Sequence, residues 1–147
     1  MSTTGLEVFD RTIQLTNIWL DEITKRIGPD RAVAWKVLST VLHKLRDRLP
    51  MELAVHLGAQ LPLLVRGVYY DQFEPANLPA EWHSSDEFIH EVQKWLSDIR
   101  PVDAKDAIAA VFGVLSSHIS AGQIEKIRQA LPRDIRTLWP EPEPKAA

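Results

Sequence analysis

The chain has 147 residues, of which 45% are hydrophobic, and a formal net charge of −3, so we expect one soluble globular domain. It contains no cysteine, which excludes disulfides, thiolate metal sites and cysteine nucleophiles. No apolar run is long enough to span a bilayer, and the N-terminus is polar and acidic. We therefore expect a cytoplasmic protein with neither a membrane segment nor a secretory signal.

The first half of the chain predicts four helices, two long ones followed by a medium and a short one. From Asp10 onward, apolar residues keep helical spacing until Gly28-Pro29 ends the run. Asp30 is suited to cap a second long helix with a buried apolar face, which ends at Pro50. Pro50 and Pro62 can each open a further helix, because proline is tolerated in a first turn.

The middle of the chain separates these helices from a second set. Residues 71–85 hold two prolines and three acids, which predicts an irregular connector. Ser84 and Glu87 then form a capping-box signature, in which the hydroxyl accepts from a free backbone N–H and the carboxylate reaches back. The helix that starts there is expected to stop at Arg100-Pro101.

A further long helix and a tail complete the pattern. Asp103 can cap the long helix, and Ser120 with Gln123 gives another capping box. No segment alternates apolar and polar residues between turn signals, so we predict no sheet. Beyond Trp139 prolines alternate with charged residues, and we expect residues 140–147 to form a mobile tail.

The chain also resembles itself. Residues 41–69 match residues 111–139 without a gap at an offset of seventy positions, mainly in their apolar positions and in the Leu-Pro pairs that end at Pro62 and Pro132. We therefore predict an all-α fold, a single compact domain of about eight helices over residues 1–139. It consists of two tandem repeats, about 10–70 and about 86–139, related by a pseudo-two-fold axis.

Charge is distributed unevenly between these parts. Residues 25–70 carry eight Lys and Arg against three acids, whereas residues 71–98 carry seven acids against one Lys. The basic repeat and the acidic segment could attract each other, either within one chain or between two copies. Alternatively, both are solvated faces of amphipathic helices.

Several strings resemble a known family. They are Val41-Leu-His-Lys-Leu-Arg-Asp-Arg-Leu-Pro50, His56-Leu-Gly-Ala-Gln-Leu-Pro62 and Arg66-Gly-Val-Tyr-Tyr70, with Leu138-Trp139-Pro140 near the end. The chain is similar over almost its whole length to domain-of-unknown-function family 2267. This resemblance implies a small, all-helical, stand-alone bacterial or archaeal protein, and it implies no reaction.

Metal binding would need three or four converging ligands. Glu52 and His56 lie four residues apart on one predicted helix, and Asp86, Glu87 and His90 share another turn. Each group supplies only part of a ligand set, and the repeat provides no matching ligand. We therefore predict no metal site and no cofactor.

Catalysis and nucleic-acid binding are also not expected. Ser116, Ser117 and His118 are neighbours, but adjacent helix residues point in different directions. The glycines are scattered singly, so no phosphate-binding loop is predicted. The basic residues are interspersed with a core-facing pattern and the whole chain is acidic. We predict no catalytic residues and do not expect nucleic acid as a partner.

Two arginine–aromatic groups occupy equivalent positions in the two repeats. Arg66 precedes Tyr69 and Tyr70, and Arg136 precedes Trp139, each arginine three residues before an aromatic residue and hence on the same helix face. Such pairs could frame a binding groove by stacking. Alternatively, they close each repeat, with the aromatic ring in the core and the arginine capping carbonyl groups.

Two functional hypotheses follow. The first is a non-enzymatic helical interaction module that binds a protein partner or itself, as a regulatory or stress-linked accessory factor. Trp82 and Trp35 are candidate exposed anchors for that contact, beside the two arginine groups. The alternative is a small-ligand-binding protein or an enzyme with a pocket between the two repeats.

Overall fold

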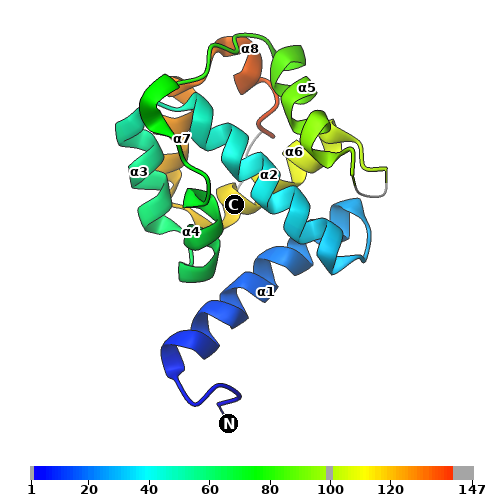
Figure 1. Ribbon diagram of the computed structural model, residues 1–147, viewed down its shortest axis with the longest axis vertical. Helices are drawn as coiled ribbons and strands as arrows, with labels where there is room; N and C mark the ends of the chain where they lie inside the picture. The colour runs from blue at the N-terminus through cyan, green and yellow to red at the C-terminus, as the bar shows by residue number, and fades with distance from the viewer. Residues whose placement is uncertain (1, 99–100, 141–147) are drawn as a thin grey trace, which may run out of the picture.

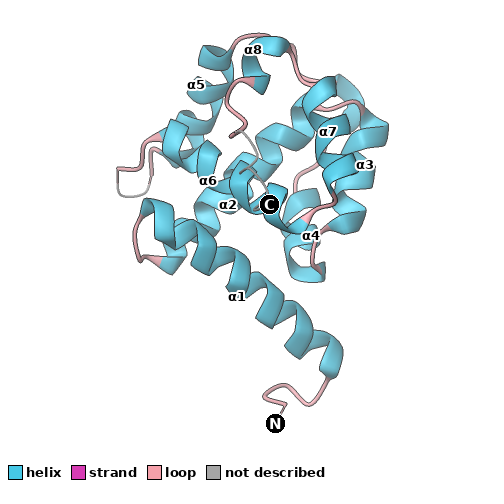
Figure 2. Ribbon diagram, turned by 180° about the vertical axis from the view of Figure 1, so that it is seen from behind, coloured by secondary structure: helices cyan, strands magenta, loops and turns pink. Residues whose placement is uncertain are grey.

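The computed structural model describes residues 2–98 and 101–140, and this part of the chain contains eight α-helices, one 3-10 turn and no strand (Figures 1 and 2). The all-α class predicted from the sequence is confirmed. The helices are α1 (Glu7–Ile27), α2 (Arg31–Arg48), α3 (Met51–Gln60), α4 (Leu63–Tyr70), α5 (Ser85–Leu96), α6 (Ala104–His118), α7 (Ala121–Ala130) and α8 (Arg133–Arg136), and the 3-10 turn is η1 (Pro75–Asn77). Arg100, at which a helix stop is predicted, and residues 141–147 of the tail predicted over 140–147 lie outside the described residues.

Polar side chains begin several helices where the sequence predicts. Asp30 accepts hydrogen bonds from the backbone N–H groups of the first turn of α2, and Asp103 does the same for α6. Ser84 and Glu87 form both halves of a capping box at the start of α5. Ser120 accepts from the backbone N–H of Gln123, but the reciprocal bond is not formed among the described residues. The second capping box is therefore only half formed.

Two helix boundaries differ from the prediction. Helix α1 begins at Glu7, about one turn before the predicted start at Asp10. Its N-terminal half extends away from the body of the molecule (Figure 1). Helix α5 ends at Leu96, before the predicted stop at Arg100-Pro101.

Helices α2 and α6 form the centre of the core. They contact each other, and α1 and α5 each pack against both of them. The inward side chains of both central helices are completely buried, and burying such a side chain contributes about 1.5–3 kcal/mol. The buried set on these two helices includes Val37, Leu38, Val41, Leu42 and Leu45 of α2, and Ala107, Ile108, Val111, Phe112 and Leu115 of α6.

The two halves of the chain show the same local structures at the offset of seventy residues. Helices α3 and α7 have equivalent bounds, and the prolines that precede α4 and α8 have nearly the same backbone angles, φ −54° and ψ 147° at Pro62, φ −52° and ψ 145° at Pro132. The contacts of α1 with α4 and of α3 with α4 correspond to those of α5 with α8 and of α7 with α8. The pseudo-two-fold relation itself stays a prediction.

Candidate functional site

The arginines of the two predicted groups bond to carbonyl groups at the end of the preceding helix. Arg66 donates to the carbonyls of Gly58, Ala59 and Leu61 at 3.0–3.1 Å. Seventy positions on, Arg136 Nη2 donates to the carbonyls of residues 129 and 131 at 3.3 and 3.2 Å. Both guanidinium groups therefore satisfy carbonyls that a helix terminus leaves free.

The tyrosines of the first group pack inside the first half of the chain. Tyr69 is fully buried and its hydroxyl donates to the carbonyl of Ala54 at 2.6 Å, so burial holds the pKa of Tyr69 above its usual value. Tyr70 lies edge-on to Tyr69 and tilted against Phe73. The ring of Phe73 in turn lies 5.0 Å from the guanidinium carbon of Arg46.

The two tryptophans among the predicted site residues lie at opposite ends of one row of rings. Trp82 lies edge-on to Phe88, Phe88 contacts Phe112, and Phe112 stacks on Trp139 at 4.2 Å between centroids. Trp139 also donates its ring N–H to Ser116 Oγ. Among the described residues, no ring contact or side-chain hydrogen bond links Trp82 or Trp139 to Arg66, Tyr69 or Tyr70, so such contacts do not join the six residues into one site.

The other candidate groups are also placed apart. No group of three His, Cys, Asp or Glu side chains that could hold a metal ion occurs among residues 2–98 and 101–140. Ser116 accepts the tryptophan N–H, Ser117 donates to a backbone carbonyl, and His118 contacts Glu22 and stacks on Trp19. The three neighbours therefore have different partners.

The basic segment, residues 25–70, and the acidic segment, residues 71–98, form ion pairs with each other within the chain. Lys36 and Lys44 of α2 approach Asp98 and Glu91 at 3.8 and 3.9 Å. Lys44 also lies over the rings of two tryptophans, Trp95 at 4.8 Å and Trp82 at 5.8 Å. Attraction between the basic and the acidic segment, one of the alternatives left open by the sequence, is thus observed between α2 and the α5 region.

The surface with the most exposed apolar side chains lies on α1. The buried stripe of this helix contains Thr16, Leu20 and Ile23. With the same spacing of three and four residues, the stripe continues toward the N-terminus through Ile13, Phe9 and Leu6, which are 42%, 48% and 51% exposed. One helix face therefore passes from the core into solvent without a change in its apolar character.

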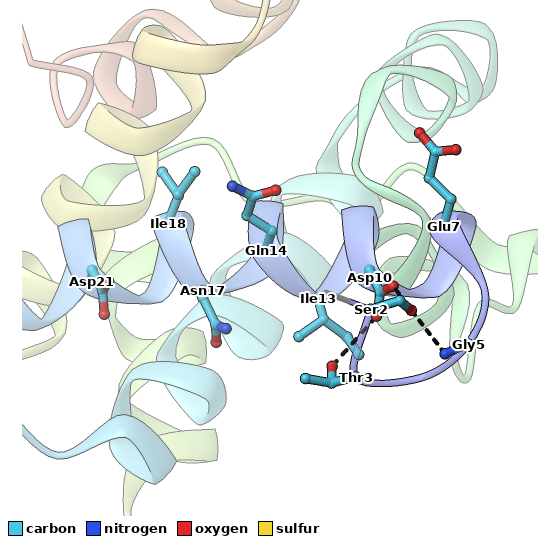
Figure 3. Close-up of a pocket in the computed structure, with 10 residues that line it drawn as sticks. All are labelled: Ser2, Thr3, Gly5, Glu7, Asp10, Ile13, Gln14, Asn17, Ile18 and Asp21. Carbon is cyan, nitrogen blue, oxygen red and sulfur yellow. Dashed lines mark hydrogen bonds between the residues drawn. The ribbon is translucent and has the colours of Figure 1, made fainter.

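The loop before α1 folds back along this helix. Asp10 accepts hydrogen bonds from the hydroxyls of Ser2, Thr3 and Thr4, and the bonds from Ser2 and Thr4 hold the pKa of Asp10 below its usual value. Figure 3 shows Ile13 and Asn17 on the side of α1 on which Thr3 lies, whereas Gln14 and Ile18 point the other way. The loop and the helix thus enclose a shallow hollow at the projecting end, lined by Ile13 and Asn17 among others.

A second hollow continues this surface toward the body. It has a volume of about 240 Å³ between α1, α2 and the start of α4, and it is lined by Ile13, Thr16, Asn17, Leu20, Arg31, Trp35 and Leu64. We call it the α1–α2–α4 groove. The Thr16 hydroxyl is buried and has no hydrogen-bond partner within residues 2–98 and 101–140. Because both hollows share Ile13 and Asn17, they form one continuous surface.

Sequence reasoning missed most of this surface. Trp35, a predicted exposed anchor, lines the groove but is half-buried against the core. Leu6 and Phe9 were not assigned to a helix, although their spacing from Ile13 follows the 3.6-residue period and would have placed them on the stripe. The exposure of Leu6 and Phe9 could not be predicted from the sequence, because it depends on how far along α1 the other helices pack against it.

Comparisons with known proteins give a family without an assigned reaction. A family model described as an uncharacterised conserved protein, DUF2267, matches residues 16–138. The match starts at Thr16, the position at which the stripe of α1 becomes buried. No curated protein matches the sequence. None of the described helices is long and apolar enough to cross a membrane.

Proposed function

We propose that this chain, which belongs to the DUF2267 family, is an interaction module that pairs with a second copy of itself through the projecting half of α1. The observation that carries the proposal is the continuity of the α1 stripe. Leu6, Phe9 and Ile13 extend the buried face of the helix into solvent. A short helix with such a face is marginal in water by itself, and burial against a partner would stabilise it.

The sequence of the stripe favours a second copy as the partner. When two α1 helices cross antiparallel about Ile13, Phe9 of one copy lies level with Asn17 of the other, and Leu6 lies level with Leu20. Asn17 and Leu20 line the α1–α2–α4 groove. The exposed half of each stripe therefore meets the groove of the other copy, and both contacts form at once.

Charge is complementary in the same arrangement. Glu7 lies in the first turn of α1, which approaches the groove of the other copy near residue 20. The positive group there is Arg31, which contacts Asn17 and Asp21 at the edge of the groove. An acid of one copy is thus placed near a base of the other, which favours this register over a parallel one.

The size of the surface predicts a weak dimer. Stable interfaces bury about 1,600 Å² in total, and smaller ones are typical of transient contacts. The proposed contact uses a single helix face with Leu63 and Leu64 beside it, and we expect it to bury less than this area. As part of the same proposal, we place the association in the cytoplasm, since a chain without cysteine needs no oxidising compartment.

The proposal places the contact on α1 and not on the six residues singled out from the sequence. The polar atoms of Tyr69, Tyr70 and Trp139 are hydrogen-bonded within the chain, and both arginines donate to helix carbonyls. Trp82 packs against the core. A partner could use these groups only by replacing bonds that already exist.

Sedimentation velocity over a wide range of protein concentrations tests the proposal. We expect the sedimentation coefficient to rise with concentration, and we expect Ile13→Glu to abolish the rise, because it places a charge at the centre of the contact. Val55→Glu is the matched control, since Val55 on α3 is 44% exposed and Ile13 is 42% exposed.

Two results would contradict self-association. One is a wild-type protein that stays monomeric at every concentration. The other is a concentration dependence that Ile13→Glu and Val55→Glu change equally, because the contact would then not be centred on α1.

A further inference from the structure

A third hollow lies between α2 and α5. Its volume is about 320 Å³, at the lower end of the range of about 300–1,000 Å³ found for small-molecule sites. Its polar lining comes mainly from one face of α2, and Gln72 and Trp95 contribute from the loop after α4 and from α5. We call this cavity the α2–α5 pocket. It is separate from the α1 surface and shares no lining residue with the α1–α2–α4 groove.

Donor groups follow one another along α2 in this pocket. Lys36, Thr40 and Lys44 are spaced by four residues, so they lie on the same helix face. Arg46 also lines the pocket, and its guanidinium group donates to the carbonyls of Tyr69 and Asp71 at the end of α4 and just after it. Asp47 is the one acid of the lining, and it is already paired with Arg46 Nε at 2.8 Å.

The hydroxyl of Thr40 is available to a ligand. Thr40 is only 5% exposed, yet its side chain has no hydrogen-bond partner among the described residues. The Thr40 hydroxyl oxygen is not one of the fully buried polar atoms that lack a partner in this part of the chain, so it is open to the pocket and free to bond to a bound group. A ligand oxygen in the pocket would supply the missing partner.

The two lysines are held by long and replaceable ion pairs. Lys36 lies 3.8 Å from the exposed carboxylate of Asp98, and Lys44 lies 3.9 Å from Glu91. Both distances exceed that of a charge-assisted hydrogen bond, about 2.7–2.9 Å. Burial also lowers the pKa of Lys44, the largest effect on that group, so its ammonium is poorly solvated. An anion in the pocket would give both lysines a closer counter-charge.

The side of the pocket that contains Trp95 favours a ligand with an aromatic or other planar group. Trp95 is 50% exposed and its ring lies 4.8 Å from Lys44 Nζ. Gln72 adopts φ 61° in the left-handed region, which is costly for a residue other than glycine and brings its side chain to the pocket. His43 also lines the pocket, and its Nε2–H donates to the backbone carbonyl of Val68 at 2.6 Å.

The equivalent face of α6 lacks these groups. At the offset of seventy positions, Lys36, Thr40, His43 and Lys44 correspond to Asp106, Ala110, Gly113 and Val114. Both helices occupy the centre of the core. The polar face of α2 is therefore not required to build a central helix.

We propose that the α2–α5 pocket binds a small phosphate monoester with a planar ring, its phosphate between Lys36, Lys44 and Thr40 and its ring against Trp95. Three separate donors exceed the two oxygens of a carboxylate and suit the three terminal oxygens of a phosphate. This site lies between the two halves, where the sequence allowed a ligand pocket, but it uses none of the six residues predicted for it.

Calorimetric titration with phenyl phosphate, inorganic phosphate and phenol tests the site. We expect phenyl phosphate to bind with a Kd of about 1 mM or tighter, about tenfold more tightly than inorganic phosphate, and phenol not to bind measurably. Equal affinities for phenyl and inorganic phosphate would overturn the contact with Trp95. Binding of phenol as tight as that of phenyl phosphate would overturn the phosphate site, as would no binding of any probe.

Two variants locate the binding. We expect Lys36→Met and Thr40→Val each to raise the Kd of phenyl phosphate by about tenfold. Because Thr40→Val removes a hydroxyl that makes no hydrogen bond among the described residues, the variant should fold about as stably as the wild type. Thr16→Val is the control, since it removes a threonine hydroxyl that also has no hydrogen-bond partner among the described residues but lies outside the pocket. An equal loss of affinity in Thr16→Val and Thr40→Val would overturn the assignment.

Discussion

The segment from α2 to α4 and the segment from α6 to α8 have similar local structures but different chemistry. Both contain a Leu-Pro corner with nearly the same angles, and in both an arginine of the last helix caps the preceding helix. The central helix of the first segment carries a buried arginine, a histidine and two lysines on its outer faces. The central helix of the second has small or apolar residues at most of the equivalent positions.

Helices α1 and α5 also differ, and here too the additional feature belongs to the first half of the chain. At the offset of seventy, α5 corresponds to the second part of α1, and residues 77–84 of the connector stand where α1 has its projecting turns. Features common to both halves are therefore enough for the fold. The features found in one half only, the projecting α1 and the polar face of α2, are the ones we connect with function.

Arg46 and its counterpart Ser116 should differ most in their effect on stability. Arg46 is 3% exposed and donates to the carbonyls of Tyr69 and Asp71 as well as to Asp47. Arg46→Met leaves these acceptors buried or unpaired, and we expect it to lower the free energy of unfolding by about 3–5 kcal/mol. Ser116→Ala removes one hydrogen bond to Trp139 and should cost about 1 kcal/mol. Urea unfolding measures both, and equal losses would show that the halves are not specialised as described.

We expect Arg66 and Arg136 to cap the preceding helices in the same way but to contribute unequally to the free energy of unfolding. Arg66 reaches three carbonyls at 3.0–3.1 Å, whereas Arg136 reaches two at 3.2–3.3 Å and its buried Nε has no partner in the described part of the chain. We expect Arg66→Ala to cost about 2–3 kcal/mol and Arg136→Ala about 1 kcal/mol, within the usual range for bonds to charged groups. The same urea experiment checks this order. A larger loss for Arg136→Ala would contradict the capping geometry.

His43 should give the smallest effect, visible as a pH dependence that its counterpart Gly113 cannot produce. Burial, and next the charge of Arg46, lower the pKa of His43 from 6.5, against the opposing effects of the Val68 carbonyl, Asp47 and Asp71. The unfolded chain therefore takes up a proton at a higher pH than the folded protein. Stability should be constant above this range and fall as the pH drops below about 6.5.

Melting temperatures at pH 7.5 and pH 5.5 measure this dependence. His43→Gln keeps a side-chain donor for the Val68 carbonyl but cannot titrate, so its melting temperature should change less between the two conditions than that of the wild type. An equal change in both proteins would mean that His43 does not titrate differently on folding.

Much of the fold could be predicted from local signals. Asp30, Ser84 and Asp103 cap helices as expected because a short polar side chain before an apolar stripe satisfies free N–H groups whatever the rest of the chain does. The Leu-Pro corners at Pro62 and Pro132 were equally clear, since proline restricts its own backbone and that of its neighbour.

The candidate sites could not be predicted in this way. Arg46 looked like part of a basic helix surface, but its burial depends on the chain after α4 folding back over it. The opening of the α2–α5 pocket depends on the packing of Trp95 from a distant helix. The sequence did contain one usable signal, the polar residues of α2 that align with alanine, glycine and valine in α6.

Amide chemical shifts recorded by NMR at low and high protein concentration test the central claim most directly. We predict that the shifts change along residues 7–20 of α1 and at Arg31, Trp35 and Leu64, while α6, α7 and α8 stay constant. A spectrum that does not depend on concentration would contradict this claim, as would shift changes on α6 to α8. In either case the contact would not lie on the projecting half of α1, which has no counterpart in the second half of the chain.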